Sequence, residues 1–569
     1  MAEIRGCVVT YREWLLGWHY RVSVPALMVW MVLWCGAPTV QAEPQEVSRE
    51  PEIRLVLVIA VDQFRGDYLE RFSPWLEGGL ARLLETGLVY RDGHQHHAVT
   101  STGPGHASIA TGVYPARSGI ISNGWFDRSK KETVNCVEDP YSPIVKTGYS
   151  ASRNYAVSIP DKSGRSPAHL LVTTLPDWIK EAVPGSKVFA ASRKDRGAIL
   201  LGGKKADLAV WYDGDTGEFV SSTYYTLELP GWLKEFNRNR WPDQFFGKAW
   251  TPLIDISSSF DKAQVKVTDQ GWFDKSFPHA IGGRSLKPNA SFYSSFGSTP
   301  FMDNYLAELG RRIILEEGLG EDGTVDYLSL SFSTLDSAGH SYGPNSPEVL
   351  DTVIRLDRTL GEFFDFLEER IGMNHVLVAL SSDHGVVDLP EVRSQAGLPG
   401  RRLGSQDILC LQRQGQAFLN ATPDPSFNWF ISSDYLNYEV LGHHNLKRSF
   451  IEDLYASALE ECDFIQKVWT RTELLEASKS DADDHFLQLY LNSFHPDRSP
   501  DFLVQNEEYF LPSSGYGSTH GSPYRYDTHV PIIVAIPGTE PAKIDQLART
   551  VDIAPTLADV LGIQTPPDL

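Results

Sequence analysis

Residues 375–385 read HVLVALSSDHG, an apolar run that stops at two strong metal ligands, Asp383 and His384. A short run this rich in Val and Leu is typical of a fully buried strand in a parallel sheet. A polar turn that closes such a strand often contains Asp, so the pair by itself is equally consistent with an ordinary turn. The rest of the sequence decides between a turn and a chemical role.

Four further apolar runs have the same character, and helical patterns lie between them. The runs are RLVLVIAV (54–61), KVFAAS (187–192), DYLSLSFS (326–333) and VPIIVAI (530–536). Helical spacing is clear at 75–87, at 346–370 after a Ser cap, and at 552–562. We predict that all five runs are buried parallel strands. Their alternation with helices predicts an α/β fold, with a mostly parallel central sheet and helices on both faces.

The 569 residues leave room for more than this core. At roughly 150 residues per domain, the length allows several domains, or one large α/β core with insertions. Residues at about 125–185 and 204–300 are rich in Trp, Tyr, Pro, Ser and Gly and have weak periodicity, which indicates insertions that form a cap or rim. Residues at about 390–510 look like a further mixed insertion. We therefore predict one main domain at 50–569.

The first 42 residues resemble a secretory signal. Arg12 and Arg21 precede an apolar run that is too short and interrupted for a confident membrane span. The run ends at Val40-Gln41-Ala42, a small-residue pattern suited to signal peptidase. We predict a signal peptide at 1–42, a periplasmic or secreted protein, and no stable membrane insertion after cleavage. The alternative is an uncleaved membrane anchor.

Charge and cysteine content exclude two kinds of chemistry. The net charge is -22 and no long basic run occurs, so we expect no nucleic-acid partner. Cleavage after residue 42 would leave Cys136, Cys410 and Cys462, whose spacing fits no cysteine-based metal site. One disulfide and one free thiol are possible, and the sequence leaves the pairing open.

Metal-ligating residues follow three of the predicted strands. Asp62 comes directly after the first run, Asp336 and His340 follow the run at 326–333, and Asp383 and His384 follow the run at 375–380. In an open parallel sheet, ligands bind beyond the carboxyl ends of the strands. Each Asp alone is consistent with a turn or a helix cap, but independent turns have no reason to recruit histidines as well.

A sixth ligand candidate, His520, lies in a loop before the last apolar run. His529 abuts that run, and we expect a structural or supporting role for it. We expect the histidines of HQHH (94–97) to lie on the surface or to support the site without binding metal. The resulting set of carboxylates and imidazoles, without thiolate, suits zinc. Six ligands are more than one tetrahedral zinc ion can bind. We predict two Zn²⁺ ions about 4 Å apart, bound by Asp62, Asp336, His340, Asp383, His384 and His520.

A nucleophile candidate, Thr102, occurs in VTSTGPGHASIATG (99–112). Pro104 suits the first turn of a helix, and Gly112 suits its end. Thr102 would then lie at a helix N-terminus, where backbone N–H groups favour an alkoxide or a phosphoryl group. An ordinary threonine cap is the alternative. A zinc-bound threonine hydroxyl can ionise near neutral pH, much as zinc-bound water does.

These motifs resemble the alkaline phosphatase superfamily, and most closely its phosphate-irrepressible branch with a single threonine nucleophile. The resemblance covers most of the chain beyond the signal and rests on VDQFRGDYL, TSTGPGH, GIISNGWFD, SRKDRGAIL, STLDSAGHSYGP, SSDHG and STHGSPYRYDTHVPI. By this resemblance, Asn123 contacts the phosphoryl group, and Lys194 and Arg196 form the cationic pair of the monoesterase branch. The sequence departs from relatives at Thr-Gly-Pro-Gly-His, where bulkier residues often flank the threonine.

The resemblance also implies a ligand scheme and a mechanism. One zinc is held by Asp62, Asp383 and His384 together with Thr102, and the other by Asp336, His340 and His520. Thr102 attacks phosphorus in line, and water activated by the second zinc hydrolyses the resulting phosphothreonine. We therefore expect a monomeric, secreted phosphate monoesterase that acts on small-molecule phosphate monoesters.

Two other functions remain open at this stage. The first is a phosphodiesterase or nucleotide pyrophosphatase on the same metal core. The second is a non-catalytic protein that binds phosphate ligands. A sulfatase is disfavoured because no Cys/Ser-x-Pro-x-Arg motif occurs where Thr102 lies.

Overall fold

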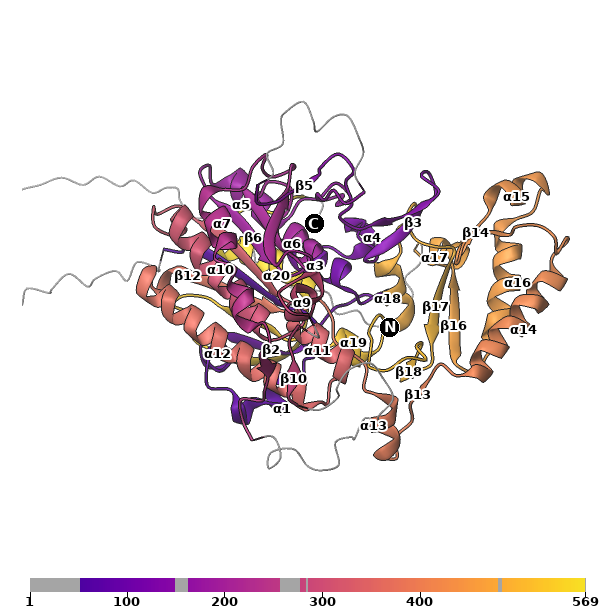
Figure 1. Cartoon of the computed structure of the whole chain (residues 1–569). Coiled ribbons are helices and arrows are strands. Elements are labelled where there is room, and N and C mark those ends of the chain that lie inside the picture. Colours follow the sequence, from indigo (N-terminus) through magenta and orange to yellow (C-terminus); the bar gives the residue numbers. More distant parts are fainter. Residues whose placement is uncertain (1–51, 149–161, 256–276, 283–284, 479–483, 568–569) are drawn as a thin grey trace, which may run out of the picture. The chain divides into compact units, whose positions relative to one another are not determined.

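The run at 375–380 forms β12, a strand near the middle of a ten-stranded sheet (Figure 1). A computed structural model describes residues 52–148, 162–255, 277–282, 285–478 and 484–567. The predicted signal peptide at 1–42 lies outside the described residues. Residues Glu50–Leu569 form one compact unit. No helix in the described ranges is long and apolar enough to cross a membrane.

The strand order in the sheet is β20-β2-β19-β12-β1-β11-β6-β7-β8-β5. The strands are β1 (Leu55–Val61), β2 (Leu88–His94), β5 (Ile144–Val145), β6 (Val188–Ser192), β7 (Leu208–Asp213), β8 (Glu218–Ser222), β11 (Asp326–Phe332), β12 (Val376–Ser381), β19 (Ile532–Ala535) and β20 (Ala542–Arg549). The five central strands from β12 to β7 are all parallel. The predicted α/β class, with a mostly parallel sheet, is therefore confirmed.

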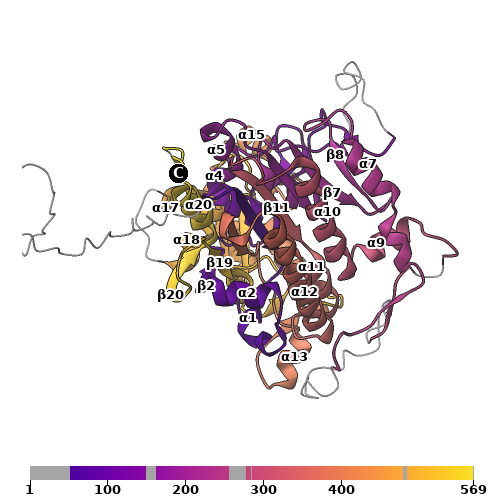
Figure 2. The ribbon, with the colours of Figure 1, turned by 90° about the vertical axis from the view of Figure 1, so that its left-hand side faces the viewer.

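Both faces of the sheet are apolar, and helices cover each of them. In β1, Leu55, Leu57 and Ile59 pack into one core, whereas Val56 and Val58 pack into the other. The first core contains α2 (Gly79–Thr86), α10 (Phe301–Glu317) and α12 (Pro347–Arg370), and the second contains α3 (Thr102–Thr111), α5 (Leu175–Ala182), α6 (Asp195–Gly202) and α20 (Ile553–Val560). Figure 2 shows α12 beside α10 and α11 (Thr334–Tyr342). Burial on both faces explains why the strands read as continuous apolar runs.

One predicted parallel strand runs in the opposite direction. The run at 530–536 forms β19, which pairs antiparallel with both β12 and β2. Ile532, its first residue, lies opposite Ser381, the last residue of β12. The chain therefore enters β19 from the edge of the sheet where β12 ends, and it can only run back across the sheet. An apolar run carries no information on direction, so the prediction of a parallel strand was wrong here.

The segments predicted as insertions differ in their relation to the sheet. Strands β7 and β8, within 204–300, and β5, within 125–185, extend the main sheet instead of lying over it. The same two segments and their flanks also form β3 (Gly124–Asp127), β4 (Glu132–Asn135), α7 (Gly231–Arg238), β9 (Ala249–Trp250), β10 (His279–Ala280) and α9 (Ala290–Phe296). A cap or rim is thus not the whole role of these residues.

Residues 390–510 build a mixed region with an apolar core of its own. Its elements are α13 (Pro390–Gln395), β13 (Arg401–Arg402), α14 (Ser405–Ala421), β14 (Phe430–Ser432), β15 (Tyr435–Leu436), α15 (Tyr438–His443), α16 (Arg448–Glu460), β16 (Ile465–Thr470), α17 (Arg471–Ala477), α18 (His485–Ser493) and β17 (Phe502–Asn506), with β18 (Phe510–Leu511) just beyond. In Figure 1 these elements are orange, and α16 lies beside both α14 and β16.

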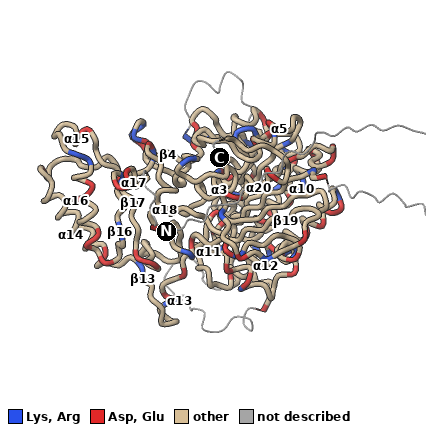
Figure 3. The backbone as a smooth tube through the Cα atoms, turned by 180° about the vertical axis from the view of Figure 1, so that it is seen from behind, with Lys and Arg blue, Asp and Glu red and all other residues tan. Residues whose placement is uncertain are grey.

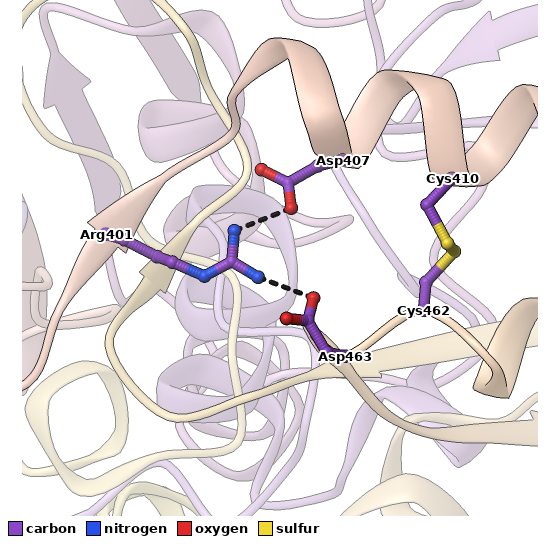
Figure 4. Close-up of a disulfide and its surroundings, with 5 residues drawn as sticks. All are labelled: Arg401, Asp407, Cys410, Cys462 and Asp463. Carbon is purple, nitrogen blue, oxygen red and sulfur yellow. Dashed lines mark hydrogen bonds and ion pairs between the residues drawn. A yellow bond between two sulfur atoms is a disulfide. The ribbon is translucent and has the colours of Figure 1, made fainter.

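A disulfide joins Cys410 of α14 to Cys462, just beyond α16 (Figure 4). Arg401 pairs with Asp407 at 2.6 Å and with Asp463 at 2.8 Å in the same place. These contacts tie three parts of the region together. Cys136 is the buried free thiol, so the pairing that the sequence left open is Cys410 with Cys462.

Acidic and basic side chains are interspersed along the backbone of this unit (Figure 3). Many lie in ion pairs on the surface, such as Arg82 with Asp365 and Arg91 with Asp545. The net charge of -22 is therefore spread over the chain. The local concentrations of charge that matter for chemistry lie at the carboxyl ends of the central strands.

Candidate active site

Three carboxylates lie at the carboxyl edge of the three adjacent strands β12, β1 and β11. Asp62 directly follows β1, Asp383 follows β12 after one residue, and Asp336 lies in the first turn of α11, just after β11. All three side chains are buried. The parallel register of these strands places their ends at one edge, which brings together residues more than 300 positions apart in the sequence.

Three imidazoles face these carboxylates in a uniform way. His340 Nδ1 lies 2.8 Å from Ser518 O, His384 Nδ1 lies 2.9 Å from Gly385 O, and His520 Nδ1 lies 2.7 Å from Thr100 O. A backbone carbonyl can only accept, so each Nδ1 carries a proton, and in a neutral ring Nε2 then presents a lone pair. A second partner that fixes the tautomer in this way is typical of metal-ligating histidine.

The Nε2 atoms point at the carboxylates. His384 Nε2 lies 3.5 Å from both Asp62 Oδ1 and Asp383 Oδ2, and His340 Nε2 lies 3.2 Å from Asp336 Oδ1. His520 Nε2 is 4.0 Å from Asp336 Oδ1, and its ring stacks on that of His384 with centroids 3.5 Å apart.

Two sets of side chains have the proximity that a metal ion requires. Asp62, Asp383 and His384 form one set, and Asp336, His384 and His520 form the other, with ligand atoms within 4.8 Å of one another in each. The first matches the ligand group expected from the sequence. In the second, His384 occupies the place expected for His340, although His340 contacts the same carboxylate and its ring centroid is 5.1 Å from that of His520.

The protonation states of His384 and His520 suit metal binding, whereas for His340 burial lowers the pKa but the hydrogen bond to Asp336 outweighs it and raises the pKa. Burial lowers the pKa of His384 to about 4 and that of His520 to about 3, so both are neutral near pH 7. Burial, together with the charges of Asp336 and Asp383, raises the pKa of Asp62. Burial also opposes ionisation of Asp336, but Lys194 and His340 outweigh it and hold the pKa of that carboxyl well below its usual range.

Several buried atoms of this cluster have no hydrogen-bond partner among the described residues. They include Asp62 Oδ1, Asp383 Oδ2 and His384 Nε2. An unpaired buried polar group is costly, and a native structure normally satisfies it. Since all three atoms are electron-pair donors that face one another, a cation is the partner that satisfies them together. The residues therefore fit a metal site of mixed nitrogen and oxygen ligands.

Thr102 is the first residue of α3 and is buried against this cluster. Its hydroxyl lies 3.3 Å from Lys194 Nζ, which also contacts Asp62 Oδ2 at 2.5 Å and Asp336 Oδ2 at 2.8 Å. Gly112 ends the helix in the left-handed conformation, with φ of 70°. The predicted helix therefore exists, and it brings a hydroxyl to the carboxylate edge.

The other predicted phosphoryl contacts lie around the same helix end. Asn123 Oδ1 accepts from the Gly103 N–H at 2.7 Å, which leaves the amide nitrogen of Asn123 as a donor. Lys194 is the residue before α6, and Arg196 lies in its first turn. Burial lowers the pKa of Arg196, but nearby charges, Asp195 first and then Cys136, Asp62 and Asp336, outweigh it and raise the pKa.

Two supporting residues are absent from the sequence-based set. His106, one turn after Thr102, is fully buried; its Nδ1 lies 2.9 Å from Thr102 O and 3.2 Å from Asp383 Oδ2. Gln63 contacts two of the carboxylates. His106 could have been found from the sequence, because its i, i+4 spacing from Thr102 places both on one face of the predicted helix. No sequence pattern marks Gln63, which is simply a glutamine after an aspartate in a turn.

Three histidines that the sequence analysis leaves out of the metal site, His94, His97 and His529, have structural contacts. His97 is buried with Nε2 3.1 Å from Gln95 Oε1, and Gln95 Nε2 donates to Ser382 O, next to Asp383. His94 packs on His529 with ring centroids 5.2 Å apart. None of these histidines belongs to a metal-binding group in the described ranges.

Comparison with known proteins identifies the family of this chain. Residues 56–524 match the family model of type I phosphodiesterase / nucleotide pyrophosphatase, and the chain belongs to this family. It is 33% identical over 556 residues to alkaline phosphatase PhoV of Synechococcus elongatus, across 94% of this chain and 96% of that protein. It is 29% identical over 583 residues to alkaline phosphatase PafA of Elizabethkingia meningoseptica, across 98% and 97% of the two chains.

A solved structure is similar over the same length. The crystal structure of wild-type alkaline phosphatase PafA superimposes with a TM-score of 0.78 at 28% identity, and covers 90% of this chain and 97% of that one. The resemblance inferred from the motifs is therefore confirmed at the level of family and fold.

The two glycines after Thr102 provide a test of the packing. A Cβ on Gly105 would lie 2.5 Å from Asp383 Cα, whereas one on Gly103 would lie 3.1 Å from Cys136 Sγ. We expect Gly105→Ala to lower kcat/KM for p-nitrophenyl phosphate by about 100-fold, because it pushes the Thr102 helix away from a rigid backbone. Gly103→Ala, which adds the same methyl to the same helix, should cost less than about 10-fold. Equal losses in the two variants would contradict this geometry.

Proposed function

We propose that this chain is a periplasmic or secreted phosphate monoesterase that uses two Zn²⁺ ions and Thr102 as its nucleophile. The observation that carries the proposal is the convergence of Thr102 Oγ1, the Lys194 ammonium and a buried carboxylate–imidazole cluster at one helix N-terminus. The names of the relatives, alkaline phosphatases across nearly the full length of the chain, support the same reaction.

The ligand sets divide between the two ions. Asp62, Asp383 and His384, with the Thr102 hydroxyl, would hold one ion. Asp336, His340 and His520 would hold the other. When bound, the ions would lower the pKa of the threonine hydroxyl and of a water molecule, and they would neutralise charge that develops on phosphoryl oxygens.

The residues of the chain carry the two displacement steps. Thr102 Oγ1 gives up its proton to solvent and forms a bond to phosphorus while the bond to the leaving-group oxygen breaks, and that oxygen takes a proton from solvent. Water then loses a proton and attacks phosphorus in the phosphothreonine, the Oγ1–P bond breaks, Oγ1 takes up a proton, and inorganic phosphate and threonine result. Thr102 lies at the N-terminal end of α3, where the positive end of the helix dipole favours negative charge at Oγ1 in both steps.

Lys194, Arg196 and the Asn123 amide are the groups proposed to contact the phosphoryl oxygens. A monoester dianion has three non-bridging oxygens and more charge than a diester, so it gains more from a dense set of cationic donors. Arg196 suits bidentate contact, whereas Lys194 acts as a point charge. A diesterase activity is the second candidate, because the matching family model describes phosphodiesterases.

The cellular setting is also a proposal. A signal peptide at 1–42 would direct the protein to the periplasm or the medium, where the disulfide between Cys410 and Cys462 is stable. We propose that the mature protein acts as a monomer on soluble phosphate monoesters.

The substrate class can be tested with Lys194→Ala. We expect the native protein to prefer p-nitrophenyl phosphate over bis-p-nitrophenyl phosphate, and Lys194→Ala to lower kcat/KM for the monoester at least about 10-fold more than for the diester. Lys187→Ala is the matched control, since Lys187 precedes β6 at the opposite end of the strand. If the native protein prefers the diester, the monoesterase assignment is rejected. If Lys194→Ala loses the same factor in kcat/KM on both substrates, the proposed contact of Lys194 with the phosphoryl oxygens is rejected.

The covalent route can be tested with Thr102→Ala. We expect this variant to bind zinc but to lose at least about 1,000-fold in kcat, because the nucleophile is gone while the other ligands remain. Thr102→Ser, which keeps a hydroxyl at the same position, should retain most activity. Rapid acid quench of the native enzyme with labelled substrate should trap phosphate on Thr102. Near-normal turnover by Thr102→Ala would refute the mechanism.

A further inference from the structure

Gln63 connects the three strand ends that carry the carboxylates. It directly follows Asp62 at the end of β1. Its backbone N–H donates to Asp383 Oδ1 at 3.1 Å, and its side-chain Nε2 donates to Asp336 Oδ1 at 2.9 Å. One residue therefore joins β1, β12 and the helix that follows β11. Gln63 is itself almost completely buried.

These bonds leave the carboxylates oriented in a specific way. Asp383 Oδ1 accepts from Gln63, while Asp383 Oδ2 lies 3.2 Å from His106 Nδ1 and 3.5 Å from His384 Nε2. Asp336 Oδ1 accepts from Gln63 and lies 3.2 Å from His340 Nε2, and Asp336 Oδ2 contacts Lys194 at 2.8 Å. Gln63 thus fixes one oxygen of each carboxylate and restricts the orientation of the whole group.

The backbone of Gln63 is in an unfavourable conformation. Its φ is 65°, in the left-handed region that glycine adopts freely and a side chain with a Cβ does not. Strain of this kind persists where the surrounding structure enforces it, and it concentrates at functional sites. Glycine would relieve the strain but would remove the amide that reaches Asp336.

The neighbouring helix leaves room for the amide. Gly339 lies in α11 between Asp336 and His340, and a Cβ there would overlap Gln63 Oε1. Gln63 is buried, and its side-chain Nε2 donates to Asp336 Oδ1. The amide could therefore move away from that Cβ only by giving up this hydrogen bond. The Gln63 side chain can therefore hold this position only because residue 339 is glycine.

We propose that Gln63 is a positioning residue that orients Asp336 and Asp383 for metal binding, and that Gly339 is required to admit its amide. This inference rests on the proposed function for its consequence in turnover, but not for its consequence in zinc binding. Gln63 touches neither substrate nor metal in this account, and it acts through the carboxylates. Partners that orient metal ligands in this way typically change metal affinity or activity by about 10–100-fold when removed.

The test is a double-mutant cycle between positions 63 and 339, with zinc affinity measured by competition with a chromophoric chelator. We expect Gln63→Gly and Gly339→Ala each to weaken zinc binding and to lower kcat/KM by about 10–100-fold. In the Gln63→Gly background, Gly339→Ala should add less than about twofold, since the amide it displaces is already absent. The matched control is Lys131→Gly, which removes an exposed side chain at another left-handed position, with φ of 55°, in the turn between β3 and β4.

The outcomes separate this inference from the proposed function. The role of Gln63 would be overturned if Gln63→Gly bound zinc within twofold of the native affinity. It would also be overturned if Gly339→Ala weakened zinc binding in the Gln63→Gly background as much as it does in the native protein. If Gln63→Gly does not fold, Gly339→Ala alone decides: weakened zinc binding supports the role, and unchanged binding overturns it. If the native protein binds zinc but hydrolyses no phosphate ester, the proposed function is overturned. The double-mutant cycle measured by zinc affinity then still tests the role of Gln63.

Discussion

The mutual repulsion of three buried carboxylates is the constraint on which the site depends. Asp62, Asp336 and Asp383 face one another away from water, and the raised pKa of Asp62 reflects the cost of that arrangement. Buried like charges are tolerated only when cations compensate them. Lys194 supplies one positive charge, and the unpaired atoms of Asp62, Asp383 and His384 indicate where further positive charge belongs.

The fold places these groups with little freedom of adjustment. Parallel pairing of β12, β1 and β11 fixes the relative positions of the strand ends, and α3 approaches the same edge because Gly105 allows it to pack on the backbone of Asp383. The loop with His520 then returns through β19, whose antiparallel direction follows from its entry at that edge. A hydroxyl, an ammonium group and the ligand cluster meet as a result of sheet topology.

Much of this could be predicted from the sequence, because the buried strands have an unmistakable composition and the ligands follow them directly. The α/β class, the helix at Thr102 and the candidate ligand residues at the strand ends were accessible in this way. The direction of β19 could not be predicted, since apolar runs do not encode direction. The strands at 208–222 could not be predicted either, because a segment rich in Trp and Tyr resembles a loop-rich insertion. The role of Gln63 depends on a backbone conformation and on a space beside Gly339, and neither leaves a pattern in the sequence.

The most direct test of the central claim is to locate metal ions in crystals of the purified protein by anomalous scattering at the zinc edge. The account predicts two peaks about 4 Å apart, one beside Asp62, Asp383 and His384 and the other beside Asp336 and His520. Crystals of zinc-loaded protein that give no peak among these side chains would contradict it.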